Sequence, residues 1–195
     1  MEHPLHLFGY CPRCGSNTFV INDIKSKRCG ECGFVLYFNA IAATVALIMN
    51  KRGELLVARR SKEPAKGTLD LPGGFADSME TAEEGVAREV LEETGIRMEI
   101  DRLGFVHENY FLGDSPAKLG KLIYEISFFF YMKVPDDFAP TGESFTEDDH
   151  KEFLRWVSPD EDVKMYPMFF KTELLNPADT VKHFVTDNRK KQNLN

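Results

Sequence analysis

The sequence lacks the long apolar run that a membrane-spanning helix requires, which is roughly 18 residues or more. Its opening segment, MEHPLHLFGY, also lacks the charged stretch followed by an apolar one that is typical of a secretion signal. We therefore expect a cytoplasmic protein that has no membrane partner.

An excess of positive charge is missing as well. The 195 residues carry a formal net charge of −7 at pH 7, whereas a protein that binds nucleic acid usually presents a basic face. We therefore expect no nucleic-acid partner. A small anionic substrate stays compatible with this composition if local cations or metal ions offset the overall charge.

Cysteine is absent beyond residue 32. The four cysteines form two C-x2-C pairs separated by 14 residues, and they are Cys11, Cys14, Cys29 and Cys32. This spacing is typical of a zinc site with four thiolate ligands, and the alternative, two disulfides, is unusual in a cytoplasmic protein. Four thiolates leave no open coordination position, so we predict a structural Zn²⁺ in a small zinc ribbon. A module this short has little core, and the metal would be its main source of stability.

Beyond the ribbon, the pattern of apolar segments predicts strands first, then a helix, then more strands. The segment AIAATVALIMN at 40–50 is a run of small and branched apolar residues, which is typical of a strand buried on both faces. This order of elements predicts an α+β fold, an α/β/α sandwich in which a mixed sheet lies between helices. Further strands are expected at 18–21, 34–37, 54–60, 68–74, 96–111, 121–134 and 151–158, with a short helix within 159–170.

These segments divide the chain into three parts. We predict the zinc ribbon at 1–38, a larger α+β domain at 39–185 and a polar tail at 186–195.

One acidic segment, GGFADSMETAEEGVAREVLEETGI at 73–96, predicts a helix with defined ends. Thr81 followed three residues later by Glu84 is a capping box, which marks the helix start. Gly95 is a plausible C-cap just after the last helical residue. The apolar residues that recur every four positions, and that we expect to pack on the sheet, are Ala82, Val86 and Val90.

Three carboxylates gather near the end of this helix. Glu89, Glu92 and Glu93 stand at i, i+3 and i+4, so they share one face. The helix dipole favours cations there, and like-charged pairs at these spacings destabilise a helix by roughly 0.2–0.5 kcal/mol each. A divalent cation would reverse the sign of this effect. We therefore predict that the three glutamates bind a hard metal ion, for which carboxylate oxygens are suitable ligands.

The whole acidic segment resembles the Nudix box, G-x5-E-x7-R-E-U-x-E-E-x-G-U, where U is an aliphatic residue. The strand order around it is also similar to that family, so the resemblance covers about 40–158. It implies a mixed sheet between helices, and the hydrolysis of a diphosphate linked to another group, often a nucleoside, with Mg²⁺ or Mn²⁺. The matching positions are Gly74, Glu80, Arg88, Glu89, Val90, Glu92, Glu93, Gly95 and Ile96.

Carried over position by position, the resemblance implies roles for these residues. Glu89, Glu92 and Glu93 would bind the catalytic metal. Arg88 would hold the glutamates through charge-assisted hydrogen bonds, and Glu80 would anchor the loop.

The resemblance also implies contacts outside the helix. The carbonyl of Gly73 or Gly74 would complete the coordination shell of a metal ion. Arg59 and Arg60 end a strand that faces the substrate cleft in the family, so either could bind phosphate. A surface salt bridge is the alternative role for each arginine.

The general base that takes the proton of the attacking water stays open. A box glutamate, Glu92 or Glu89, is one candidate. The acidic loop at 135–150 offers Glu143, Glu147 and Asp148 as others, and each of these could equally be an exposed loop residue.

A zinc ribbon followed by this box is similar to the NADH pyrophosphatase branch of the family. That branch has a signature rich in Ser, Gln, Pro, Trp and Phe after the box, whereas the matching stretch here, EIDRLGFVHENYFLGDSPA, contains no tryptophan. The chain is also shorter than that branch. ADP-ribose, an NADH-like dinucleotide and a nucleoside triphosphate therefore all stay open as substrates. His107, in this stretch, and His150 are expected to be ordinary polar residues.

A regulator is the alternative function class to an enzyme. The fold could sense a nucleotide as a regulator while the ribbon contacts nucleic acid or protein. The complete box and the few basic residues of the ribbon favour the enzyme. A homodimer is common in the family, and the sequence leaves it open.

Overall fold

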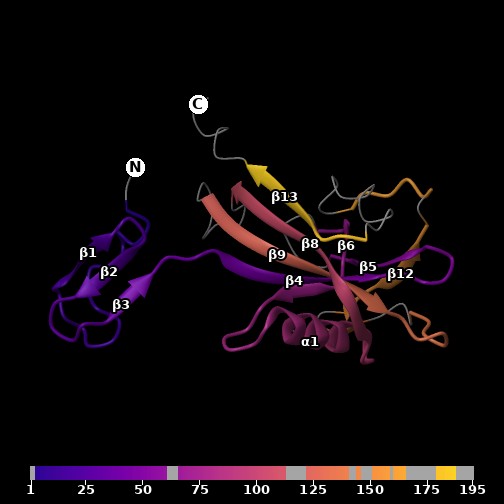
Figure 1. Ribbon diagram of the computed structural model, residues 1–195, viewed down its shortest axis with the longest axis horizontal. Helices are drawn as coiled ribbons and strands as arrows, with labels where there is room; N and C mark the ends of the chain where they lie inside the picture. Colours follow the sequence, from indigo (N-terminus) through magenta and orange to yellow (C-terminus); the bar gives the residue numbers. More distant parts are fainter. Residues whose placement is uncertain are drawn as a thin grey trace. The chain divides into compact units, whose positions relative to one another are not determined.

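The structure is a computed structural model, shown in Figure 1. The chain forms two compact units, Met1–Ala40 and Ile41–Asn195. The residues that the structure describes are 3–60, 66–112, 122–140, 144–145, 151–158, 160–165 and 179–187.

The first unit contains a three-stranded antiparallel sheet in the order β1-β2-β3. Strands predicted at 18–21 and 34–37 are present as β1 and β3, whereas β2 was not predicted. The strands are β1 Phe19–Asp23, β2 Ser26–Cys29 and β3 Val35–Tyr37.

Strand β2 was missed because its sequence, SKRC, looks polar and exposed. In the structure Lys27 is buried, and its ammonium donates a hydrogen bond to the Phe8 carbonyl. The same ammonium lies 5.1 Å from the centre of the Phe19 ring, which is a cation–π distance. Contacts from other parts of the ribbon therefore bury a strand that has no apolar pattern of its own.

The second unit is built on a five-stranded mixed sheet in the order β13-β8-β9-β4-β7. Strand β4 runs parallel to β9, and β13 runs parallel to β8, while the other neighbours are antiparallel. The strands are β4 Ile41–Ile48, β7 Gly73–Phe75, β8 Glu99–Leu112, β9 Leu122–Lys133 and β13 Lys182–Asp187.

A smaller sheet of this unit has the order β12-β5-β6, and a separate pair joins β10 to β11. The strands predicted at 68–74 and 151–158 are each divided in two. The bounds are β5 Leu55–Arg59, β6 Leu69–Asp70, β10 Ser144–Phe145, β11 Lys151–Glu152 and β12 Leu154–Val157.

Both faces of β4 are buried, as predicted. On one face Leu47 packs in a cluster with Phe129 of β9. On the other face Ile48 packs in a cluster with Val86 and Val90. The apolar stripe of the helix therefore packs on the sheet, which confirms that prediction.

The helix α1, Ala82–Thr94, has the ends that the sequence predicts. The Thr81 side chain accepts a hydrogen bond from the Glu84 N–H, and the Glu84 carboxylate accepts one from the Thr81 N–H. Gly95 has a left-handed backbone with φ 77° at the C-cap. Figure 1 shows α1 along the sheet beside β4, and it contacts β4, β7, β8 and β9.

Two elements differ from expectation near the end of the chain. The helix predicted within 159–170 is wrong for the part that the structure describes, because 160–165 contain no helix. The Lys164 carbonyl instead accepts a hydrogen bond from the Leu69 N–H at 3.0 Å, which joins this segment to β6. Residues 159 and 166–170 lie outside the described residues. Strand β13 was not predicted.

No helix among the described residues is long and apolar enough to cross a membrane.

Candidate functional site

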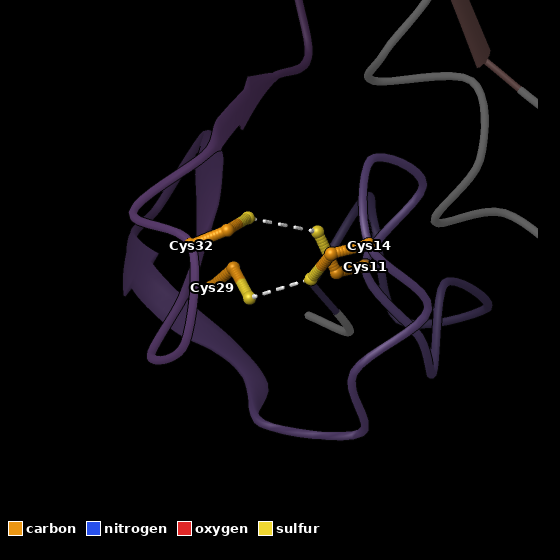
Figure 2. Close-up of side chains that lie close together, drawn as sticks. All are labelled: Cys11, Cys14, Cys29 and Cys32. Atoms are coloured by element: carbon orange, nitrogen blue, oxygen red, sulfur yellow. Dashed lines mark hydrogen bonds between the residues drawn. The ribbon is translucent and has the colours of Figure 1, made fainter.

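The four cysteines of the first unit meet at one point, as Figure 2 shows. Their Sγ atoms all lie within 4.8 Å of one another. The Cys11–Cys32 sulfurs are 3.7 Å apart and the Cys14–Cys29 sulfurs 3.6 Å apart, whereas a disulfide bond is about 2.05 Å long. Tetrahedral ligands with Zn–S bonds of about 2.3 Å would have sulfurs about 3.8 Å apart. The arrangement therefore fits a tetrahedral metal ion and not two disulfides.

Each C-x2-C pair closes with the same backbone turn. The Gly15 N–H donates to the Cys11 carbonyl at 2.8 Å, and the Gly33 N–H donates to the Cys29 carbonyl at 3.1 Å. Both glycines have positive φ, 75° and 73°, which other residues adopt with strain. The backbone N–H of Cys32 lowers the pKa of Cys29 to about 6. This favours the thiolate at Cys29, which is the metal-binding form of cysteine. Although a bond from the Ser16 N–H lowers it, the Cys32 thiol and burial raise the pKa of Cys14 to about 12, so Cys14 would lose its proton on binding the metal.

The second candidate site centres on the Arg88 guanidinium of α1. Its Nη1 donates to Glu89 at 3.0 Å and to Glu92 at 3.3 Å. Its Nη2 and Nε donate to the two oxygens of Glu80 at 2.9 and 3.2 Å. A further bond joins Nη2 to the Phe75 carbonyl of β7 at 3.1 Å. One cation therefore holds three carboxylates of the box against the edge of the sheet.

These ion pairs keep the site charged. The Arg88 bonds lower the pKa of Glu80, and Glu80 in turn raises the pKa of Arg88. Glu80 also accepts a hydrogen bond from the Asp77 N–H. This carboxylate therefore joins the loop before α1 to the helix itself.

The two glycines of β7 allow the helix glutamates to approach the backbone closely. A side chain at Gly73 would overlap the Thr44 carbonyl oxygen of β4, and its φ is 145°. A side chain at Gly74 would overlap the Glu89 carboxylate. Glu93 is buried, and its Oε1 accepts a hydrogen bond from the Gly73 N–H at 3.4 Å. The structure therefore brings Glu89 and Glu93 beside β7, while Glu92 is joined to the same group through Arg88.

The two candidate phosphate-binding arginines lie at the end of β5. The Arg60 guanidinium forms an ion pair with the Asp70 carboxylate of β6, and both side chains are about a quarter exposed, at 23% and 24%. Arg59 is exposed. The phosphate-binding role of both residues stays a prediction.

The candidate general bases of the acidic loop cannot be placed in the same way. Glu143, Glu147 and Asp148 lie outside the described residues, as does His150. Strand β10, which follows Glu143 in the chain, contacts α1. The general base therefore stays open among these residues and the box glutamates.

Sequence reasoning missed two groups that contact Arg88. One is the Phe75 carbonyl, and the other is the Asp77 carboxylate, which lies 3.6 Å from Nε. Both residues follow Gly74 within three positions. Their place in the short stretch between the box glycine and α1 is the signal that could have identified them.

Comparisons with known proteins identify the family of the second unit. A family model described as a NUDIX domain matches residues 39–171. A MutT-like protein of Streptomyces ambofaciens is 31% identical over 137 residues, which cover 70% of this chain and 76% of that protein. The NAD-capped RNA hydrolase NudC of Vibrio parahaemolyticus is 33% identical over 96 residues, which cover 49% of this chain. The match spans only 36% of that relative's own length.

Solved structures agree on the fold. The crystal structure of a NUDIX hydrolase from Nitrosomonas europaea matches with a TM-score of 0.60 and 21% identity, and it covers 91% of this chain and 99% of that one. At this identity the likeness concerns the fold alone. It confirms the α+β architecture with a mixed sheet that the sequence predicts.

Proposed function

The chain belongs to the NUDIX family, and on this basis we propose that it uses Mg²⁺ or Mn²⁺ to hydrolyse a diphosphate bond in a nucleoside diphosphate derivative. The single observation that carries the proposal is the Arg88 guanidinium, which gathers Glu80, Glu89 and Glu92 beside the glycines of β7. Arg88 supplies one positive charge against the carboxylates of Glu80, Glu89 and Glu92. The excess of negative charge that is left supports a bound divalent cation, for which carboxylate oxygens are suitable ligands.

The first group of residues in this proposal binds the metal ion. Glu89, Glu92 and Glu93 hold the divalent cation, with the carbonyl of Gly73 or Gly74 as a further ligand. A bound cation would neutralise diphosphate charge and lower the pKa of the water that attacks phosphorus.

The remaining groups orient these ligands and move the proton. Arg88 bonds to three carboxylates, so it positions the ligands and does not itself bind phosphate. One carboxylate of the site accepts the proton of the attacking water.

The candidate substrates are ADP-ribose, an NADH-like dinucleotide and a nucleoside triphosphate. The similarity to an NAD-capped RNA hydrolase, the NudC relative, supports a substrate with a dinucleotide end group. We assign Arg59 and Arg60, at the end of β5, to the phosphates of the substrate. Arg59 is the stronger candidate, because it is exposed whereas Arg60 already forms an ion pair with Asp70.

The first unit has a different metal in this proposal. Four thiolates at tetrahedral spacing suit Zn²⁺ and leave no position for substrate. The ion there would stabilise the ribbon and take no part in hydrolysis.

A substrate panel tests the proposal. The purified chain is incubated with ADP-ribose, NADH, nucleoside triphosphates and an NAD-capped RNA oligonucleotide, each with Mg²⁺, with Mn²⁺ or with EDTA. We expect release of nucleoside monophosphate or pyrophosphate from at least one substrate, and loss of this activity in EDTA. Absence of turnover on every member would overturn the proposal, and nucleotide binding without turnover would favour the regulator.

A further inference from the structure

A pocket in the second unit lies away from the box glutamates. Its volume is about 240 Å³, and aromatic, apolar and charged side chains share its lining. Glu93 reaches β7 at Gly73, which pairs with Val45 of β4. The pocket is instead lined by Asn50, which lies five residues further along the chain. At about 3.4 Å per residue of extended chain, this is a separation of roughly 17 Å. The pocket is therefore separate from the candidate site of hydrolysis.

The turn between β4 and β5 brings two cations to the pocket. Its Gly53 N–H donates to the Asn50 carbonyl at 2.9 Å. The Asn50 side-chain oxygen accepts bonds from the backbone N–H groups of Arg52 and Glu54, at 2.9 and 3.1 Å. These bonds fix the turn that carries Lys51 and Arg52, both of which line the pocket. The Arg52 guanidinium bonds the Glu54 carboxylate at 2.6 Å, so its charge is balanced within the turn, and Lys51 supplies the cation of the rim.

A second turn, which follows β9, brings an anion and an aromatic ring. The Phe138 N–H donates to the Pro135 carbonyl at 3.1 Å, which closes a turn. Asp136 lies within this turn, and it lines the pocket together with Phe138. The Phe138 ring meets the Trp156 indole of β12 edge to face, with ring centroids 6.0 Å apart and an angle of 83° between the planes. Segments that are distant in sequence therefore meet at one pocket.

The aromatic wall of the pocket lies between the apolar core and the pocket itself. Phe138 and Trp156 are both partly buried, and they pack against the apolar cluster that contains Val90 of α1. Both also line the pocket. Aromatic rings pair favourably through offset or edge-to-face contacts, and ligand pockets combine such apolar walls with a few polar groups that fix orientation. The wall therefore suits a ligand that has a flat aromatic ring.

The rim of the pocket carries a cation and an anion in contact. The Lys51 ammonium lies 2.7 Å from the Asp136 carboxylate, and the two side chains are 82% and 75% exposed. An ion pair this exposed contributes little to stability, so each charge can exchange its partner for a ligand group at low cost. An α-amino acid has a carboxylate and an ammonium on the same carbon, and these two charges match the rim pair with the signs reversed. Its zero net charge also avoids the repulsion that an anion meets from a chain of net charge −7.

We propose that this pocket binds an α-amino acid with an aromatic side chain. The ring lies against Phe138 and Trp156, the carboxylate binds Lys51 and the ammonium binds Asp136. A residue at either end of a peptide has only one of these two charges, so the ligand is the free amino acid. Pockets for drug-sized ligands have volumes of roughly 300–1,000 Å³, and the smaller volume here suits a molecule with a single ring. The inference concerns a second site and does not depend on the proposed function.

The fluorescence of the chain tests the proposal, because Trp156 is its only tryptophan. The full chain is titrated with L-phenylalanine, and the Kd is measured by tryptophan fluorescence and by calorimetry. Three analogues each lack one part of the ligand: phenylpropionate has no ammonium, phenylethylamine has no carboxylate and glycine has no ring.

The same titrations are repeated with Lys51→Met and Asp136→Asn, which remove the two charges of the rim one at a time. The matched controls are Lys25→Met, at an exposed lysine of the first unit, and Asp101→Asn, at an exposed aspartate of β8.

We expect L-phenylalanine to bind with a Kd on the order of 1 mM or below, and glycine to leave the fluorescence unchanged. Each analogue with one charge should bind roughly two- to fivefold more weakly, as the loss of an exposed ion pair implies. Lys51→Met should weaken the binding of L-phenylalanine and phenylpropionate but not of phenylethylamine. Asp136→Asn should weaken the binding of L-phenylalanine and phenylethylamine but not of phenylpropionate, and both controls should match wild type.

Fluorescence that does not change up to roughly 10 mM L-phenylalanine overturns the inference. Heat of binding without a fluorescence change places the amino acid elsewhere and also overturns it. The same holds if an analogue with one charge binds as tightly as L-phenylalanine, or if a control weakens binding as much as its matched variant. Lys51 and Asp136 are mostly exposed, so their variants should fold, which the melting temperature checks. If one does not, the analogues carry the test on the wild-type chain.

Discussion

The two units of the chain differ in how they can be stabilised. Among the described residues of Met1–Ala40, one cluster of buried hydrophobic residues is formed by Cys11, Phe19 and Cys29, and two of these three are candidate metal ligands. Ile24 in the same unit stays 86% exposed. In Ile41–Asn195 two apolar clusters lie on the two faces of β4. A core as small as that of the first unit cannot offset the entropy of ordering its chain, so its metal would stabilise the fold.

The ligands of the two candidate metal sites also differ, in their number of open coordination positions. Four thiolates surround a metal completely and act as a cross-link between two turns. The glutamates of α1 are hard oxygen ligands that a divalent cation shares with water and substrate phosphates. We therefore expect the cysteine site to determine stability with no direct effect on hydrolysis. We expect the glutamate site to determine hydrolysis with little effect on stability.

The largest effect should follow from loss of the ribbon metal. Cys29→Ser removes a ligand that is fully buried, and we expect release of Zn²⁺ and unfolding of the first unit, since structural zinc contributes on the order of 10 kcal/mol in small domains. The thermal transition of the second unit should not change. Zinc content and limited proteolysis measure the two results, with Ile24→Ser as control. A ribbon that resists proteolysis without zinc would show that apolar packing alone holds it.

The converse test is Glu93→Gln in the second unit. We expect kcat to fall roughly 10³-fold, equivalent to about 4 kcal/mol of transition-state stabilisation. The melting temperature should stay close to that of wild type, because glutamine keeps the shape and can still accept the Gly73 hydrogen bond. Glu83→Gln, an exposed first-turn position of α1, is the matched control. Unchanged kcat in Glu93→Gln would remove this residue from the mechanism.

Elements with local signals could be predicted from the sequence. Thr81 and Gly95 define the ends of α1 through contacts within a few residues, so the cap pattern was sufficient. Val86 and Val90 follow helical periodicity and pack on the sheet. The cysteine spacing likewise predicted a cluster that the structure contains.

Elements that depend on distant contacts could not be predicted in this way. Strand β2 is buried by Phe8 and Phe19, which a window around SKRC does not include. Strand β13 exists through parallel pairing with β8, more than 70 residues earlier in the chain. The burial of His107 opposite Ser127 likewise depends on the register of β8 on β9, which the sequence around His107 does not show. Sequence patterns predict which residue types occur at the site. Which residues lie next to one another across the sheet depends on the strand register, and the sequence patterns do not give it.

The glycines of β7 allow stability and activity to be separated within the second unit. Gly73→Ala would overlap the Thr44 carbonyl at positive φ, and we expect a loss of about 3 kcal/mol in the free energy of unfolding. The atoms nearest to the new Cβ of Gly74→Ala all belong to the carboxylate end of the Glu89 side chain and none to the backbone, so about a tenfold loss of kcat/KM with little change in stability is expected.

Chemical denaturation and kinetics on the same preparations measure both effects. Gly53→Ala, at φ 74° with no atom within 4 Å, reports the cost of the backbone conformation alone. Equal destabilisation by Gly73→Ala and Gly53→Ala would show that the close approach to β4 is unimportant.

The smallest expected effect is a loss in the free energy of unfolding at low pH, and it should arise in the second unit alone. Burial lowers the pKa of His107 to about 4 from its ordinary value of 6.5. The folded chain therefore binds this proton less well than the unfolded chain, so protonation favours unfolding. Stability is complete above about pH 6.5, falls as the pH drops and levels off below about pH 4. Between pH 7 and pH 5 the expected loss is about 2 kcal/mol.

Urea unfolding at pH 7, 6 and 5 measures this loss, and His107→Gln separates it from the titration of other groups. The variant should lose about 2 kcal/mol less than wild type over this range, because it has no buried imidazole to protonate. His183→Gln should keep most of the wild-type loss, since His183 is exposed and bonds Glu108 at 3.0 Å. If wild type and His107→Gln lose stability in parallel, the imidazole of His107 is accessible to water in the folded chain and its burial does not contribute to the pH dependence of stability.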